Sequence, residues 1–235
     1  MKTFLLLHGA LRGAWLWERL EPLLRQGGAR VITLDLPGHG KRTNERGNVN
    51  MSAYISDVEN YIVKNDLRDL ILVGHSMSGI IISKVAEDLR DRIYSLAYLA
   101  AVVPLDGEAL IDLLTKERRE ALLKLEGKVQ DIFGTLEALR PAYFTDLEGE
   151  EKDFYLKQLT PQPFAAFLEK TAFNRFPDID IPKIYIMGLR DKSLPPDLTR
   201  GFARRLGVEP LEIEAGHDMM LSRPVEIADI LLKLA

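Results

Sequence analysis

The sequence predicts an α/β fold, a doubly wound and mostly parallel sheet with a helical insertion. Short apolar runs alternate along the chain with segments whose apolar residues recur every three or four positions, as strands and helices do. This alternation favours a parallel sheet covered by helices on both faces. The chain has 235 residues, 46% of them hydrophobic, which is enough for one domain with a sizeable core. The stretch 104–176 interrupts the alternation.

The first part of the chain supplies four expected strands, at residues 3–7, 30–34, 70–73 and 93–99. The run at 70–73 has no polar break, as a strand buried on both faces requires. A helix is expected over 14–24, where leucines share one face. Asn50 is placed to cap a second helix. This helix carries five residues inward, namely Tyr54, Ile55, Val58, Tyr61 and Ile62. A third helix follows residue 76, with apolar residues at four-residue spacing, namely Ile81, Val85 and Leu89.

Residues 104–176 are expected to be helical without a convincing strand. Three helices are expected there, over 110–125, around Ile132, Phe133, Leu136 and Leu139, and after Pro161 and Pro163. Because this insertion lies between strands and near the site edge of the sheet, we interpret it as a lid. Residues 1–103 and 177–235 then form the core of a single domain. The alternative is a helical subdomain with no role in the site.

The core resumes with an expected strand at 183–187, a helix over 195–206 and a last strand at 208–213. Ser222 is placed to cap the final helix, which has Pro224 in its first turn. In open parallel sheets, ligands bind beyond the carboxyl ends of the strands. The loops that follow the strands are therefore expected to share one functional edge.

Ser76 lies in the turn between an expected strand and an expected helix, within Gly-His-Ser-Met-Ser-Gly at 74–79. A strand that turns directly into a helix strains the turn residue, requires small neighbours and lifts the hydroxyl clear of the sheet. The pattern is a nucleophile elbow with one departure, because Ser78 stands where glycine is usual. Serine is small, so we expect the turn to tolerate it. The alternative is an ordinary strand-to-helix turn that contains serines.

Asp191 and His217 follow the last two strands, which gives the chain order serine, acid, histidine. A serine hydroxyl needs an adjacent base, and the base needs an acid that orients it. We therefore expect Ser76, Asp191 and His217 to form a catalytic triad. The backbone N–H groups of Met77, directly after the nucleophile, and of Ala10, after the first strand, are expected to form the oxyanion hole.

The other histidines and acids have simpler interpretations. His75 is expected to point away from the serine hydroxyl, and His39 follows a Pro-Gly turn, which favours a structural role. His8 is expected to hold the loop that follows it. Asp197, within a helix, is the second choice for the acid. Asp35 follows the second strand, where a catalytic acid would be unusual.

At these residues the chain resembles the α/β-hydrolase superfamily, and more narrowly its branch of plant methylesterases, hydroxynitrile lyases and related bacterial esterases. The matching blocks are His8-Gly9-Ala10 with Gly13-Ala14-Trp15-x-Trp17, Asp35 to Gly40, Gly74 to Met77, Tyr185 to Lys192 with Pro195, and His217 with Met220 to Pro224. The resemblance implies the triad and oxyanion donors named above. It also implies a sheet of about six strands and hydrolysis of small carboxylic esters without a metal or cofactor.

Two alternatives to a carboxylesterase remain open, cyanohydrin cleavage by a lyase and a receptor that holds a small ligand. The resemblance implies that lyases carry a lysine directly after the catalytic histidine and a threonine in place of Ala10. Here Asp218 follows the histidine, and its negative charge would oppose an anionic leaving group. Hydrolysis is therefore expected. The sequence does not specify the substrate; possible pocket residues are Phe164, Phe167 and Met219.

The composition argues against several other classes of protein. The chain has no cysteine, which excludes disulfides and thiolate sites, and its four histidines are too scattered for a metal cluster. A net charge of −4 without a clustered basic face does not favour a nucleic-acid partner. No apolar run is long enough to span a membrane or form a signal core, so a cytoplasmic location is expected. The expected partner is a small-molecule ester, and the oligomeric state is open.

Overall fold

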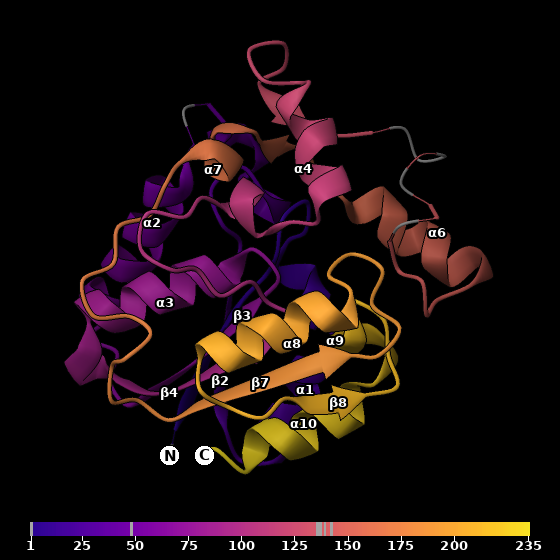
Figure 1. Ribbon diagram of the computed structural model, residues 1–235. Helices are drawn as coiled ribbons and strands as arrows, with labels where there is room; N and C mark the ends of the chain where they lie inside the picture. Colours follow the sequence, from indigo (N-terminus) through magenta and orange to yellow (C-terminus); the bar gives the residue numbers. More distant parts are fainter. Residues whose placement is uncertain (1, 48, 135–137, 139, 142) are drawn as a thin grey trace.

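The computed structural model describes residues 2–47, 49–134, 138, 140, 141 and 143–235 (Figure 1). Within these residues, one parallel sheet has six strands in the order β2-β1-β3-β4-β7-β8. The strands are β1 (Thr3–Leu7), β2 (Arg30–Leu34), β3 (Leu70–His75), β4 (Ile93–Leu99), β7 (Lys183–Gly188) and β8 (Leu211–Ile213). The predicted fold class is confirmed, and β1 lies inside the sheet, between β2 and β3.

Helices cover both faces of this sheet. The principal helices of the core are α1 (Leu20–Gln26), α2 (Met51–Lys64), α3 (Ser78–Asp88), α8 (Pro196–Arg205), α9 (Met219–Ser222) and α10 (Pro224–Leu232). Leu5 and Leu7 of β1 pack in the same apolar core as α2, α3 and α8, whereas Phe4 and Leu6 pack with α1 and α10. Successive strand residues face opposite sides, so a continuous apolar strand is what two covered faces require.

The insertion between β4 and β7 lies on the side of the molecule away from α10 (Figure 1). It contains η4 (Leu110–Leu113), α4 (Lys116–Leu123), β5 (Asp131–Ile132), α6 (Gly149–Gln158), β6 (Gln162–Pro163) and α7 (Ala165–Leu168). The expectation that this segment has no strand is wrong, because β5 and β6 form an antiparallel pair. A helix was also expected around 132–139. Ile132 lies in the strand β5 instead, and residues 135–137 and 139 lie outside the described residues.

Several expected helix boundaries are corrected by local hydrogen bonds. The helix expected over 110–125 is split into η4 and α4, because Thr115 caps a new helix by accepting from the N–H of Arg118. The helix expected over 14–24 is likewise split, into η1 (Ala14–Trp17) and α1. Asn50 does cap α2, since its Oδ1 lies 2.9 Å from the N of Ala53. Two further short 3-10 helices are η2 (Gly40–Glu45) and η3 (Arg90–Arg92).

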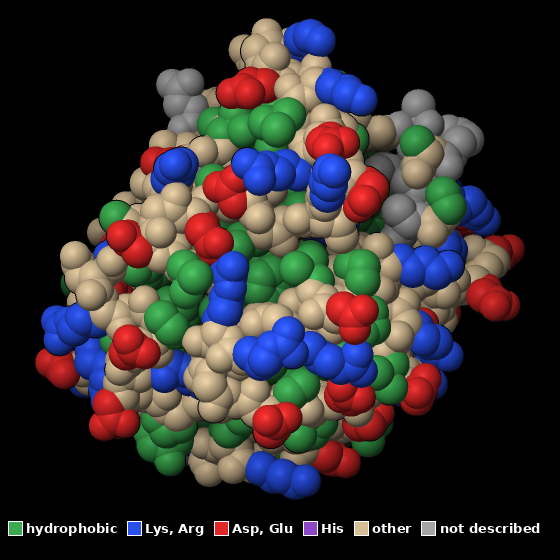
Figure 2. All heavy atoms as spheres, viewed as in Figure 1, with side chains coloured by type: hydrophobic (Ala, Val, Ile, Leu, Met, Phe, Trp, Pro, Cys, Tyr) green, Lys and Arg blue, Asp and Glu red, His purple; other side chains and the backbone are tan. Residues whose placement is uncertain are grey.

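The C-terminal segment also departs from expectation. Ser222 does not cap the last helix; it ends α9, and its hydroxyl donates to Asp146 Oδ2 at 3.0 Å. The last strand begins at Leu211 and not at residue 208. None of the helices in the described part of the chain is long and apolar enough to cross a membrane. Basic and acidic side chains are interspersed over the face shown in Figure 2.

Candidate active site

Ser76 occupies the sharp turn between β3 and α3. Its φ of +53° lies in the left-handed region, which for a residue other than glycine costs on the order of 1–3 kcal/mol. Three backbone hydrogen bonds hold it there. The Ser76 N–H donates to the Leu99 carbonyl (3.3 Å), and the Ser76 carbonyl accepts from Gly79 and Val102 (3.1 and 3.0 Å). The turn is therefore fixed by β4 and by the chain that follows it, and the half-buried side chain lies at the N-terminal end of α3.

Two glycines permit the close packing around this turn. A Cβ on Gly74 would lie 2.8 Å from the Ser78 carbonyl oxygen, and one on Gly79 would lie 1.9 Å from the Val102 carbonyl oxygen. Ser78 is fully buried, and its hydroxyl donates to the carbonyl of His8. The departure from the usual elbow sequence is thus accommodated, because the serine hydroxyl is satisfied by the loop after β1.

His217 and Asp191 follow β8 and β7 and contact each other directly. His217 Nδ1 lies 2.7 Å from Asp191 Oδ2, and both side chains are buried. The other oxygen of Asp191 accepts from the N–H groups of Ser193 (2.7 Å) and Leu194 (2.9 Å). A carboxylate held by three donors is fixed in orientation and favours the imidazole tautomer with its proton on Nδ1. His217 Nε2 is then the basic nitrogen.

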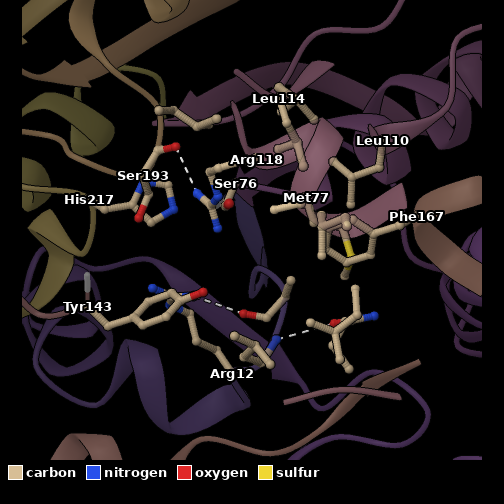
Figure 3. A pocket seen from close by; sticks show the side chains of 18 residues that line it. Arg12, Ser76, Met77, Leu110, Leu114, Arg118, Tyr143, Phe167, Ser193 and His217 are labelled. Atoms are coloured by element: carbon tan, nitrogen blue, oxygen red, sulfur yellow. Dashed lines mark hydrogen bonds between the residues drawn. The ribbon is translucent and has the colours of Figure 1, made fainter. Parts of the chain in front are cut away.

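Ser76 and His217 line one cavity, together with Ala10 and Met77 (Figure 3). Within the described residues, the backbone N–H groups of Ala10 and Met77 donate to no protein acceptor. The Met77 N–H lies at the positive N-terminal end of α3, where an oxyanion is stabilised. The cavity edge thus carries a serine hydroxyl, an oriented imidazole and two open donors.

A closed hydrogen-bond network, absent from the sequence expectations, fixes the loop after β1. The Leu11 N–H donates to Gln162 Oε1 (3.2 Å), and Gln162 Nε2 donates to the Tyr54 hydroxyl (3.0 Å). That hydroxyl lies 3.0 Å from His39 Nε2, whose Nδ1 lies 3.0 Å from Thr160 Oγ1. The Thr160 N–H donates back to the Leu11 carbonyl (2.8 Å). Burial lowers the pKa of His39 well below its usual range, so the ring in this network is neutral.

The remaining two histidines, His8 and His75, form hydrogen bonds that hold neighbouring loops. His8 Nε2 accepts from the N–H of Leu36 at 3.0 Å, and its Nδ1 lies 2.8 Å from the Gly9 carbonyl. Burial lowers the pKa of His8 to about 4. His75 Nε2 lies 3.1 Å from the His217 carbonyl, and burial lowers the pKa of this ring well below its usual range. Both imidazoles are neutral and brace the loops that carry Ala10 and His217.

Arg12 is the second feature that the sequence reasoning missed. Its Nε and Nη2 donate to the two oxygens of Asp218 at 2.6 and 2.9 Å, and both side chains are buried. Burial would raise the pKa of Asp218, but the adjacent guanidinium overcomes this and lowers it to about 2. The negative charge of Asp218, which is expected to oppose an anionic leaving group, is therefore compensated by the guanidinium of Arg12. Arg12 Nη1 also donates to the Ala10 carbonyl at 2.8 Å.

The cavity has a volume of about 190 Å³, and the insertion supplies much of its wall. Its apolar lining from the insertion is Leu110, Leu114, Ala121, Leu122, Ile132 and Phe167. Of the three expected pocket residues, Phe167 lines the cavity, whereas Phe164 and Met219 are buried and do not line it. Their apolar side chains are covered by neighbouring core residues instead.

The rival acids lie away from this arrangement. Asp197 is exposed, and its Oδ1 lies 3.4 Å from Arg200. Asp35 accepts from the N–H groups of Ala14 (2.7 Å) and Lys41 (3.1 Å), which fixes the start of η1. No group of three or more histidine and acidic side chains in the described part of the chain could hold a metal ion.

Comparison with known proteins identifies relatives over the whole chain. The family model described as "Alpha/beta hydrolase family" matches residues 4–230. The carbendazim hydrolyzing esterase of Nocardioides sp. (strain SG-4G) is 31% identical over 252 residues, covering 100% of both chains. Salicylic acid-binding protein 2 of Nicotiana tabacum is 26% identical over 100% of this chain and 97% of that one. The solved structure of an extracellular α/β-hydrolase from a Paenibacillus species has a TM-score of 0.91 and 27% identity, covering 100% of this chain and 99% of that chain.

Proposed function

Because this chain belongs to the α/β hydrolase family, we propose that it is a serine carboxylesterase that acts on small esters through Ser76, His217 and Asp191. The observation that carries the proposal is the 2.7 Å contact between His217 and Asp191, together with the cavity that both His217 and Ser76 line. The carbendazim hydrolyzing esterase, similar over its full length, supports the same reaction class.

In the first half-reaction, Ser76 Oγ attacks the ester carbonyl while His217 Nε2 takes its proton. Asp191 stabilises the imidazolium that forms, and the N–H groups of Ala10 and Met77 donate to the new oxyanion. Collapse of the tetrahedral intermediate breaks the bond to the alcohol. His217 returns its proton to the leaving oxygen, so the products are an alcohol and an acyl-serine.

In the second half-reaction, His217 accepts a proton from water as the water oxygen attacks the acyl carbonyl. The same two N–H groups bind the second oxyanion. Collapse releases the carboxylic acid, and Ser76 Oγ regains its proton from His217. The side chain of Ala10 is a methyl group, which leaves space for the attacking water beside the acyl group.

The insertion, residues 104–176, acts as the lid of this site. Its helices supply the apolar wall of the cavity, and three contacts join it to the loops that carry the proposed catalytic groups. Gln162 binds the Leu11 N–H at 3.2 Å, Arg118 donates to the Ser193 carbonyl at 2.9 Å, and Asp146 accepts from the Gly216 N–H. A wall of this kind shapes substrate choice and excludes water from the acyl group.

A fluorophosphonate probe tests this proposal, because it labels only an activated serine. The expected result is one adduct on Ser76, found by peptide mass spectrometry, together with hydrolysis of p-nitrophenyl acetate. Ser193 lines the same cavity and serves as an internal control, since it does not occupy the strained turn at the N-terminal end of α3 that holds Ser76. A label on Ser193, or no label, would contradict the proposal. Cyanide release from mandelonitrile at or above the ester rate would identify a lyase, and binding without turnover would identify a receptor.

A further inference from the structure

Arg118 is the one charged group of the cavity that no acid compensates among the described residues. It reaches the cavity from α4, and no aspartate or glutamate that the structure describes lines the same space. The other lining guanidinium, Arg12, is already paired with Asp218. Arg118 forms no ion pair within the described part of the chain, and its guanidinium makes one protein hydrogen bond, from Nη1 to the Ser193 carbonyl. Four of its five N–H donors therefore have no acceptor among the described residues and can bind a ligand.

The surroundings of Arg118 favour a negatively charged ligand. Leu114 and Leu122 line the cavity beside it, and its side chain is only half-exposed. A guanidinium among apolar walls is poorly hydrated, and its planar fork matches the two oxygens of a carboxylate. Figure 3 shows Arg118 projecting toward the part of the cavity that holds Ser193, His217 and Ser76. The positive charge thus lies within the space that a bound ester would occupy.

We infer that Arg118 forms a carboxylate subsite, and that the preferred substrates are esters that carry a second, free carboxylate, such as half-esters of short dicarboxylic acids. This inference rests on the proposed esterase function. The ester end contacts Ser76, and the free carboxylate binds Arg118. A cavity of about 190 Å³ limits the buried part to a short chain or a single ring.

The competing interpretation is that Arg118 is only a clamp between α4 and the loop that carries Asp191. A clamp needs the hydrogen bond to the Ser193 carbonyl, but it does not need the positive charge. Arg118→Gln keeps amide donors and removes the charge, whereas Arg118→Lys keeps the charge and loses the planar fork. The neighbouring Arg119 offers a matched control, because it is exposed and pairs with Asp112 at 2.9 Å outside the cavity.

The test compares kcat/KM for monomethyl glutarate with kcat/KM for methyl pentanoate, a neutral ester of the same acyl chain length. Methanol release at pH 7.5 measures both. Wild type should favour the anionic ester, and Arg118→Gln should lower that preference by about 10- to 100-fold, mainly through KM. Arg118→Lys should keep part of the preference, and Arg119→Gln should leave it unchanged.

Two results would overturn the inference. One is a preference of the wild-type protein for methyl pentanoate, a result that is measured without any variant. The other is an equal loss for both esters in Arg118→Gln, as a clamp would give. Failure of the proposed function looks different, because neither these esters nor p-nitrophenyl acetate would then be hydrolysed and Ser76 would not react with the fluorophosphonate.

Discussion

Arg12 and Asp218 form a buried, two-point ion pair between residues 206 positions apart in the sequence. Arg12 also binds the carbonyl of Ala10, and Asp218 directly follows His217. The pair therefore joins the loop after β1 to the loop after β8. In the proposed mechanism these loops carry one oxyanion donor and the base, so the pair fixes two parts of the site relative to each other.

Removing the negative charge of this pair should destabilise the fold strongly. Asp218→Asn leaves the Arg12 guanidinium buried without a counter-charge, and breaking a buried pair in this way costs about 3–5 kcal/mol. Urea unfolding followed by circular dichroism measures the loss. Asp197→Asn is the control, because that carboxylate is exposed and should change stability by less than about 0.5 kcal/mol. Equal effects from the two variants would contradict the role assigned to the pair.

The same pair should make stability depend on acid pH. Burial opposes ionisation of Asp218, but Arg12 lowers its pKa to about 2, below the value of 3.8 for a free side chain. The folded state therefore holds the proton less tightly than the unfolded state. The stabilisation is fully present above pH 3.8 and is lost as the pH falls through about 2. The difference in unfolding free energy between wild type and Asp218→Asn should shrink over this range, and a constant difference would be inconsistent with it.

The fold could be predicted because it depends on local pattern. Apolar alternation indicated the six strands, and Ser76, Asp191 and His217 each lie in the turn or loop that follows a strand. The relatives also support the predicted ester hydrolase. The contacts that support the site could not be predicted in this way. The bond from Leu11 to Gln162 spans 151 positions, and the two-residue strands β5 and β6 are too short to show a period.

Asp191 should matter far more for catalysis than Asp197. Asp191→Asn removes the carboxylate that fixes the His217 tautomer, which should lower kcat on the order of 10⁴-fold. Asp197→Asn should leave kcat within about twofold, because its carboxylate is exposed and lies 3.4 Å from Arg200 on the surface. Paired steady-state kinetics on p-nitrophenyl acetate decide the ranking, and the reverse order would show that the acid is elsewhere.

Alanine substitutions of Phe167 and Phe164 should differ in effect, the first changing substrate selectivity and the second changing only stability. Phe167 lines the cavity, so Phe167→Ala should move the preferred acyl chain of p-nitrophenyl esters to a longer length. Phe164 is buried outside the lining, so Phe164→Ala should lower stability by about 3–5 kcal/mol without changing that preference. Rates over a series of acyl lengths, with thermal unfolding of each variant, test both statements. An unchanged preference in Phe167→Ala would favour a purely structural insertion.

The most direct test of the account is the turnover of Ser76→Ala. The variant lacks the nucleophile, so hydrolysis of p-nitrophenyl acetate should fall on the order of 10⁴-fold or more, with circular dichroism and the unfolding midpoint nearly unchanged. Ser193→Ala, in the same cavity, should stay within about tenfold of wild type. If Ser76→Ala keeps more than about a tenth of wild-type turnover, Ser76 is not the nucleophile and the proposed mechanism is wrong.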